Sequence, residues 1–209
     1  GRGLPARDAI PDMISVHPNP DLVLRKGLED FARRGRKRVA VMMQEATPAI
    51  LDGAEALIRQ LGMETHPYWI HSVSAKVGFA ARRVASLLMH SAERPDALLI
   101  TDDILVEPAT AGLQDAGVRV PGDLDVLAEC NFPYPTPSHL PIRRLGFDVP
   151  ALLDMCIDII DTIRRGGAAP ASTLVPVIFE NDGKRSTGEP APPTMTGNSR
   201  HTGKKGNAS

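Results

Sequence analysis

The stretch RPDALLITDDILVEPATAGLQDAGVRVPGDLDVLAECN, residues 94–131, alternates between two patterns. Residues 96–101 (DALLIT) and 125–130 (DVLAEC) are short, mostly apolar runs, which is typical of strands buried on both faces. Between them, residues 104–116 repeat apolar side chains at helical spacing, and Gly117 follows as a stop signal. A strand, a helix and another strand in this order predict one unit of a parallel sheet.

The same alternation continues on both sides of this stretch. Further strands are expected at residues 13–16, 38–43, 65–70, 143–147 and 174–180, and further helices at 21–34, 48–61, 74–90 and 150–165. Asp21 is expected to cap the first helix. The last helix is expected to face inward with an apolar stripe made of Leu152, Leu153, Cys156, Ile157, Ile160 and Ile163. The fold class predicted is therefore α/β, with a doubly wound, mostly parallel sheet and helices on both faces.

Composition excludes several classes of protein. The 209 residues suffice for one domain and part of a second, and two cysteines are too few for a disulfide scaffold. No apolar run is long enough to span a membrane, and no secretory signal is evident, so we expect a cytoplasmic protein. The chain begins without Met, which suggests a fragment.

Charge separates a terminal tail from the rest of the chain. Residues 183–209 carry five Lys or Arg against one Glu, which gives +4, and the rest carries 19 basic against 24 acidic residues, which gives −5. A body at −5 is not a nucleic-acid surface. The tail has almost no large apolar residue, so it is expected to be disordered.

Candidate site residues follow the expected strands, because ligands of such folds bind at the carboxyl ends of the strands. They are Gln44, Ser72, Ser74, Asp102, Asp103, Cys130 and Asn131. The adjacent Asp102 and Asp103 suit a hydroxyl-rich ligand or Mg²⁺, and one of them equally suits a helix cap. Phosphate-loop, dinucleotide, zinc-protease and nucleophile-elbow motifs are absent, so no cofactor, metal or catalytic residue is assigned.

Residues 94–124 resemble the effector-binding domain of lactose-repressor-type (LacI/GalR) transcription regulators, which shares its fold with periplasmic sugar-binding proteins. The resemblance rests on Pro95-Asp96-Ala97, on Asp102-Asp103 in place of Asn-Asp, and on the run GVRVPGDL at 117–124. Residues 31–40 (FARRGRKRVA) and 185–188 (RSTG) are similar to flanking segments of that domain, so the likeness extends from about residue 13 to 188.

The resemblance implies a domain organisation and a function. Residues 1–18 would be a remnant of an N-terminal lobe and crossover, 19–182 the C-terminal lobe with a returning strand, and 183–209 a tail. The domain would bind a small molecule, a sugar or related metabolite, between its lobes and control DNA binding allosterically without being an enzyme. DNA would be contacted only by a head outside this chain, and the 104–113 helix would pack against its mate in a homodimer.

The same resemblance places ligand contacts and marks two departures. Asp102 matches the family's Asn at the ligand face, and Asp103 its neighbouring Asp. Cys130 stands where a carboxylate is usual, and Ile50 where a basic residue is usual. Two alternatives stay open at this point. One is an exported solute-binding protein of a transporter, and the other is an enzyme that holds Mg²⁺ with Asp102 and Asp103.

Overall fold

The structure, a computed structural model, describes residues 14–182. Its strands are β1 (Ser15–Pro18), β2 (Val39–Gln44), β3 (Ile70–Val73), β4 (Ala97–Ile100), β5 (Asp125–Phe132), β6 (Arg143–Asp148), β7 (Ser172–Val175) and β8 (Val177–Phe179). Its helices are α1 (Pro20–Arg33), α2 (Pro48–Gln60), α3 (Ala80–His90), α4 (Val106–Asp115) and α5 (Val149–Arg164), with short 3₁₀ turns η1 (Pro67–Trp69) and η2 (Asp103–Leu105).

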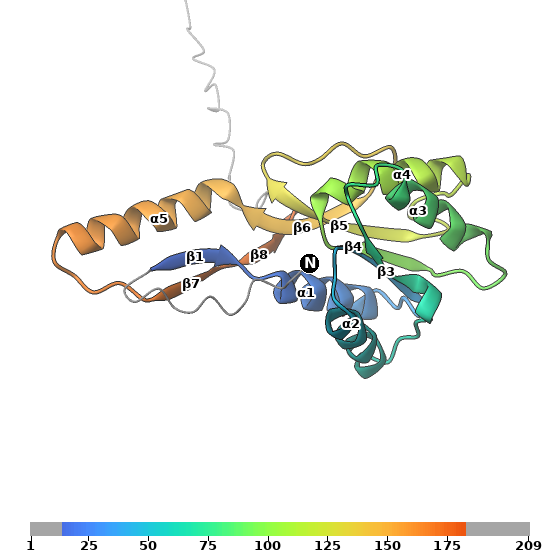
Figure 1. Ribbon diagram of the computed structural model, residues 1–209, viewed down its shortest axis with the longest axis horizontal. Coiled ribbons are helices and arrows are strands. Elements are labelled where there is room, and N and C mark those ends of the chain that lie inside the picture. The colour runs from blue at the N-terminus through green and yellow to red at the C-terminus, as the bar shows by residue number, and fades with distance from the viewer. Residues whose placement is uncertain (1–13, 183–209) are drawn as a thin grey trace, which may run out of the picture.

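Six strands form one sheet in the order β3-β2-β4-β5-β6-β8. Neighbouring strands from β3 to β6 are parallel, and only β8 runs antiparallel to its neighbour β6. Helices α1 and α2 lie on one face of this sheet, and α3 and α4 lie on the other (Figure 1). The expected α/β fold with a mostly parallel, doubly wound sheet is confirmed.

The strands divide their side chains between the two faces, as the two-residue period of a strand requires. In β2, Ala40 and Met42 join the core under α3 and α4, whereas Val39, Val41 and Met43 join the core under α1 and α2. Helices α3 and α4 pack closely because residue 112 is glycine: a Cβ there would overlap the carbonyl oxygen of Arg82.

Three expected elements were wrong in their bounds. The strand expected at 65–70 begins only at Ile70, since Pro67 opens a 3₁₀ turn before it. The helix expected from residue 74 begins at Ala80, after turns that include Gly78. The single strand expected at 174–180 is divided at Pro176 into β7 and β8, which belong to different sheets.

The cap of the first helix also differs from the prediction. Asn19, not Asp21, is the N-cap residue, and its side-chain oxygen accepts a hydrogen bond of 3.0 Å from the backbone N–H of Asp21. Asn is as favourable as Asp at this position, and Pro20 then occupies the first helical turn, where its missing N–H costs nothing.

Helix α5 lies with β1 and β7 in an arm that extends beyond the six-stranded sheet (Figure 1). The inward stripe expected on α5 is wrong, because no residue of this helix is fully buried. Leu153, Ile157, Ile160 and Ile163 are each about half exposed. The helix is amphipathic, but nothing within residues 14–182 covers this face.

The amino end of the sheet holds a buried carboxylate among arginines. Asp125, at the start of β5, is 1% exposed. Its oxygens accept hydrogen bonds from Arg34 at 2.9 Å, Arg36 at 3.2 Å and Arg143 at 3.1 Å. Burial alone would raise the pKa of Asp125, but the hydrogen bonds from Arg143 and Arg34 lower it below its ordinary value.

Two further expectations concern membrane spans and the chain termini. Among residues 14–182, no helix has the length and apolar character that a membrane crossing requires. The expected disorder of residues 183–209 lies outside the described residues, as does most of the 1–18 segment.

Candidate functional site

The carboxyl ends of β2, β4 and β5 meet at one edge of the sheet. The register aligns Met42 with Ile100 and Ile100 with Ala128, so the residues that follow come together there. Four of the expected site residues form two hydrogen-bonded pairs of side chains at this edge, Gln44 with Asp102 and Asn131 with Asp103. We refer to these four residues together with Glu129 as the carboxyl-edge cluster.

Asp102 combines the two roles that the sequence left open. It is the N-cap of η2, and its Oδ1 accepts a 3.2 Å hydrogen bond from the backbone N–H of Ile104. The amide of Gln44, with its nitrogen turned toward Asp102, donates to both carboxylate oxygens at 2.5 and 3.3 Å. Burial raises the pKa of Asp102, with a smaller contribution from the charge of Asp103, and the Ile104 bond offsets part of this shift.

Asp103 joins the β4 end to the β5 end. Its Oδ2 accepts a 2.9 Å hydrogen bond from the side-chain amide of Asn131. The pair fixes the carboxylate of Asp103 and leaves its other oxygen free of any bond from the described residues. An oriented carboxylate of this kind accepts hydrogen bonds from the hydroxyl or N–H groups of a ligand.

Glu129 is the member of the cluster that sequence reasoning missed. It is half-buried in β5, and burial, together with the charges of Asp102 and Asp103, raises its pKa to about 8. The available signal was its place in the strand: it is the one carboxylate within the otherwise apolar run 126–130. With this pKa the carboxyl group of Glu129 is mostly protonated at pH 7, and within residues 14–182 it has no hydrogen bond or ion pair that would stabilise its charged form.

Cys130 lies apart from the open cluster. Its side chain is 1% exposed, and burial raises the pKa of its thiol to about 11. The thiol is therefore neutral near pH 7 and is not activated as a nucleophile. At the paired position in β6, a Cβ on Gly146 would overlap the carbonyl oxygen of Cys130, so these two strands approach closely at this point.

The two expected serines are not joined to Asp102 by any hydrogen bond. Ser74 donates to Oε1 of Glu45 at 3.4 Å, and Lys76 lies 4.0 Å from the same oxygen. Glu45 has a backbone φ of +46°, a conformation that costs energy for a residue with a side chain and is often found at functional sites. Ser72 is exposed on the outermost strand β3, with no hydrogen bond from its hydroxyl within residues 14–182.

The cluster concentrates acceptors and contains no basic side chain. Within residues 14–182, no Lys or Arg forms an ion pair with Asp102, Asp103 or Glu129. In the same part of the chain, no three His, Cys, Asp or Glu side chains are grouped to hold a metal ion. The arrangement is suited to a ligand that donates several hydrogen bonds.

Comparison with known proteins decides the family. The sequence profile of the periplasmic binding protein-like domain matches residues 28–180. The chain belongs to this family. Among curated proteins, this periplasmic binding protein-like domain is similar to the HTH-type transcriptional repressor PurR of Aliivibrio fischeri strain MJ11, with 29% identity over 102 residues. That alignment covers 45% of this chain and 30% of the repressor, so the chain spans under a third of the length of this relative.

Solved structures confirm the fold of the domain. A LacI family transcription regulator from Clostridium acetobutylicum superposes with a TM-score of 0.62 at 20% identity, over 79% of this chain and 64% of that protein. A regulatory protein of the LacI family from Chloroflexus aggregans gives 0.64 at 18% identity, over 80% and 62%. The resemblance to the effector-binding domain of LacI/GalR-type regulators is thus confirmed.

Proposed function

We propose that this domain is the sensing part of a transcription regulator and binds a small molecule at the carboxyl-edge cluster. The observation that carries the proposal is the convergence of Asp102, Asp103, Glu129, Gln44 and Asn131 at the edge where ligands of such folds bind. The similar curated protein is a transcriptional repressor, which favours a regulator over an exported solute-binding protein or an enzyme.

The chemistry of the cluster narrows the ligand. Carboxylates and amide oxygens accept hydrogen bonds, so the ligand presents hydroxyl or N–H donors, as sugars and related metabolites do. Buried acceptors discriminate strongly against ligands that leave them unmatched. An anionic ligand is disfavoured because the cluster offers no cation to receive it.

We also propose that the arm of α5, β1 and β7 belongs to a second lobe of a longer protein. The sequence suggested a boundary after residue 18, with 19–182 in the C-terminal lobe. Because β1 pairs with β7 and α5 contacts β1, we assign β7 and α5 to the same lobe as β1. The half-exposed stripe on α5 would then be covered by the remainder of that lobe.

In this arrangement the effector acts by favouring one relative placement of the lobes. A ligand shifts such an equilibrium only by its difference in affinity for the two states. DNA would be bound by a separate part of the protein, in the cytoplasm. A homodimer through α4 would use its exposed side, where Glu107 lies next to the half-exposed Ile104.

A thermal-shift screen with one matched control tests the binding site. Sugars, sugar alcohols, nucleosides and nucleobases are added to the protein, and a binder raises the unfolding midpoint by mass action. Asp102→Asn keeps the helix cap but removes a charge from the cluster, and Glu107→Gln removes a charge from the exposed side of α4. We expect the shift to vanish in Asp102→Asn and to persist in Glu107→Gln. A shift that survives Asp102→Asn unchanged would contradict the placement of the site.

A further inference from the structure

Two hollows border the 3₁₀ turn η1, at the end of the molecule away from the arm (Figure 1). Trp69 of this turn lines both of them and is 5% exposed. The ring of His66, which lines one hollow, stacks on the ring of Tyr68, which lines the other, with 5.2 Å between the ring centroids. The two hollows are therefore adjacent, with aromatic side chains between them, and we call them together the η1 groove.

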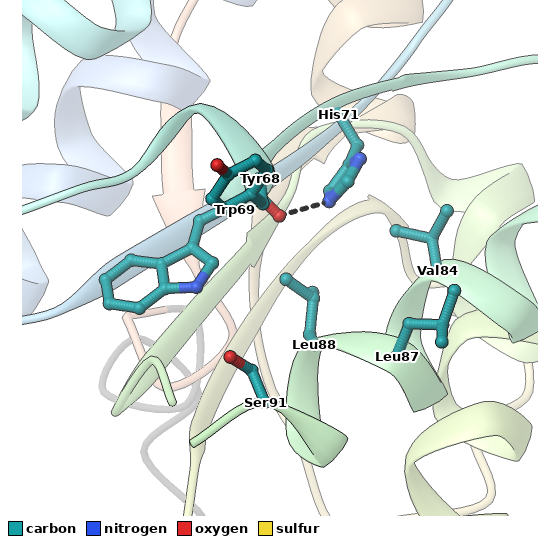
Figure 2. A pocket seen from close by; sticks show the side chains of 7 residues that line it. All are labelled: Tyr68, Trp69, His71, Val84, Leu87, Leu88 and Ser91. Carbon is teal, nitrogen blue, oxygen red and sulfur yellow. Dashed lines mark hydrogen bonds between the residues drawn. The ribbon is translucent and has the colours of Figure 1, made fainter. Parts of the chain in front are cut away.

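The first hollow, of about 260 Å³, has no charged side chain in its lining. Figure 2 shows apolar side chains of α3 on one side and aromatic side chains of η1 on the other: Val84, Leu87 and Leu88 face Tyr68 and Trp69. The Nε2 of His71 donates a 2.6 Å hydrogen bond to the carbonyl oxygen of Tyr68, and burial lowers the pKa of this ring. His71 is therefore neutral near pH 7, and the hollow suits an uncharged, apolar group.

The second hollow, of about 480 Å³, is lined on the other side of Trp69 by charged and polar side chains: Arg38, Arg59, Glu64, Thr65, His66 and Glu93. Thr65 is the enclosed member of this lining. Its side chain is 5% exposed, and its Oγ1 has no hydrogen-bond partner within residues 14–182. A buried hydroxyl without a partner costs free energy, and an occupant that hydrogen-bonds to it would recover that cost.

Two opposite charges lie next to each other in this hollow without pairing. A parallel bridge joins the backbones of Arg38 and Glu64, and residues paired in this way place their side chains on the same face. Within residues 14–182, however, neither side chain forms an ion pair within 4.0 Å. Arg59 differs, because Glu55 binds its Nε and one terminal nitrogen. The hollow therefore offers a guanidinium and a carboxylate that the described residues leave unpaired.

We propose that the η1 groove binds a free α-amino acid with an aromatic or branched apolar side chain. The carboxylate of this ligand pairs with Arg38, and its ammonium group pairs with Glu64. A ligand with a single charge would satisfy one of these side chains and be repelled by the other, so a zwitterion is the small molecule that matches both. The side chain of the ligand enters the uncharged hollow beside Trp69, where apolar burial adds affinity.

The η1 groove is separate from the carboxyl-edge cluster. Arg38 directly precedes β2, and Glu64 precedes η1 and β3, so both lie at the amino ends of these strands. The carboxyl-edge cluster follows the opposite, carboxyl ends of β2, β4 and β5. An amino acid in the η1 groove would therefore be bound at the same time as an effector at the cluster, and each site can be tested without the other.

The emission of Trp69 reports binding directly, because Trp69 is the one tryptophan of the chain. The probes are L-phenylalanine, N-acetyl-L-phenylalanine, which lacks the positive charge, and L-phenylalaninamide, which lacks the negative charge. We expect L-phenylalanine to change the emission of Trp69 saturably and to raise the unfolding midpoint. Each derivative, and glycine, which has no side chain, should bind at least about tenfold more weakly, because each loses one of the contacts.

Two substitutions at exposed positions assign the charges. Arg38→Gln should weaken the binding of L-phenylalanine and of its N-acetyl derivative, but not that of the amide. Glu64→Gln should weaken the binding of L-phenylalanine and of the amide, but not that of the N-acetyl derivative. The matched controls Arg25→Gln and Glu107→Gln change exposed residues that line neither hollow, and they should leave all three affinities unchanged.

Three results would overturn the proposal. The first is that neither L-phenylalanine nor L-leucine, at up to about 10 mM, changes the emission of Trp69 or the unfolding midpoint. The second is that the two derivatives bind as tightly as L-phenylalanine, and the third is that Arg38→Gln and Glu64→Gln affect both derivatives alike. None of these measurements involves the carboxyl-edge cluster, so their outcome does not decide the effector site proposed above.

Discussion

Strand β5 carries one carboxylate surrounded by arginines near its amino end and, near its carboxyl end, another with no basic partner in residues 14–182. Asp125 and Glu129 lie four residues apart and point to the same face of the strand, since side chains alternate with a period of two. Three arginines donate to Asp125, and the hydrogen bonds from Arg143 and Arg34 lower its pKa. Burial, together with the charges of Asp102 and Asp103, raises the pKa of Glu129 to about 8, and within residues 14–182 no Lys or Arg forms an ion pair with it.

The difference separates a structural end of the sheet from a binding end. At the amino end the chain neutralises its own buried charge, so Asp125 contributes to folding. At the carboxyl end the chain leaves acceptors without a cation, and that is unfavourable for folding alone. Sites of this kind are retained where a ligand supplies the missing partner.

The largest loss of stability is expected when the buried carboxylate at the amino end of β5 is removed. Asp125→Ala removes the shared partner of Arg34, Arg36 and Arg143 and should lower the free energy of unfolding by about 3–5 kcal/mol. Urea unfolding at pH 7 measures it. Asp154→Ala, at an exposed position of α5, should change the same quantity by less than about 0.5 kcal/mol. Equal losses of stability in the two variants would contradict the structural role of Asp125.

The strands of the sheet could be predicted from the sequence, whereas the side-chain contacts between distant residues could not. The runs at 38–43, 96–101 and 125–130 are buried on both faces, so they carry a continuous apolar signal that local reading detects. The triple-arginine environment of Asp125 joins residues up to 91 positions apart. The sequence around residues 33–38 shows only a basic turn. That Asp125 is the partner of these arginines follows from the tertiary structure alone.

The candidate site, like the sheet, could be predicted from the sequence only in part. Gln44, Asp102, Asp103 and Asn131 follow strands, and parallel strands bring such positions to one edge. Cys130 was expected at the ligand, but alternation in β5 points it to the opposite face from Glu129 and into the core. The stripe of α5 was expected to be buried because its spacing is helical, and periodicity does not reveal which segment covers it.

A smaller, pH-dependent effect is expected at the binding end. The pKa of Glu129 is higher in the folded chain, about 8, than its ordinary 4.5. The contribution of this one group to folding stability is therefore fully present below pH 4.5 and is lost as the pH rises through 8. Glu129→Gln should therefore stabilise the protein at pH 9 by on the order of 2 kcal/mol and have little effect at pH 4. Unfolding curves at both pH values measure this. A Gln variant that is no more stable at pH 9 would contradict the unpaired state of Glu129.

The smallest effect is expected from the bond between the strands. Asn131→Ala removes the donor to Asp103 and should cost about 1 kcal/mol of unfolding free energy, because one hydrogen bond to a carboxylate is lost at a partly hydrated site. Asn131→Asp should cost more, since it sets two carboxylates against each other. Chemical denaturation of both variants measures the difference, and the reverse order would argue against the Asn131–Asp103 contact.

The most direct test is a titration of the side-chain carboxyl carbons of β5 by nuclear magnetic resonance. We predict that Asp125 titrates below its ordinary pKa of 3.8 and that Glu129, four residues along the same strand, titrates near 8. A Glu129 pKa near 4.5 would show that its charge is already paired or fully hydrated. That result would contradict the claim that the carboxyl-edge cluster lacks a partner without a ligand.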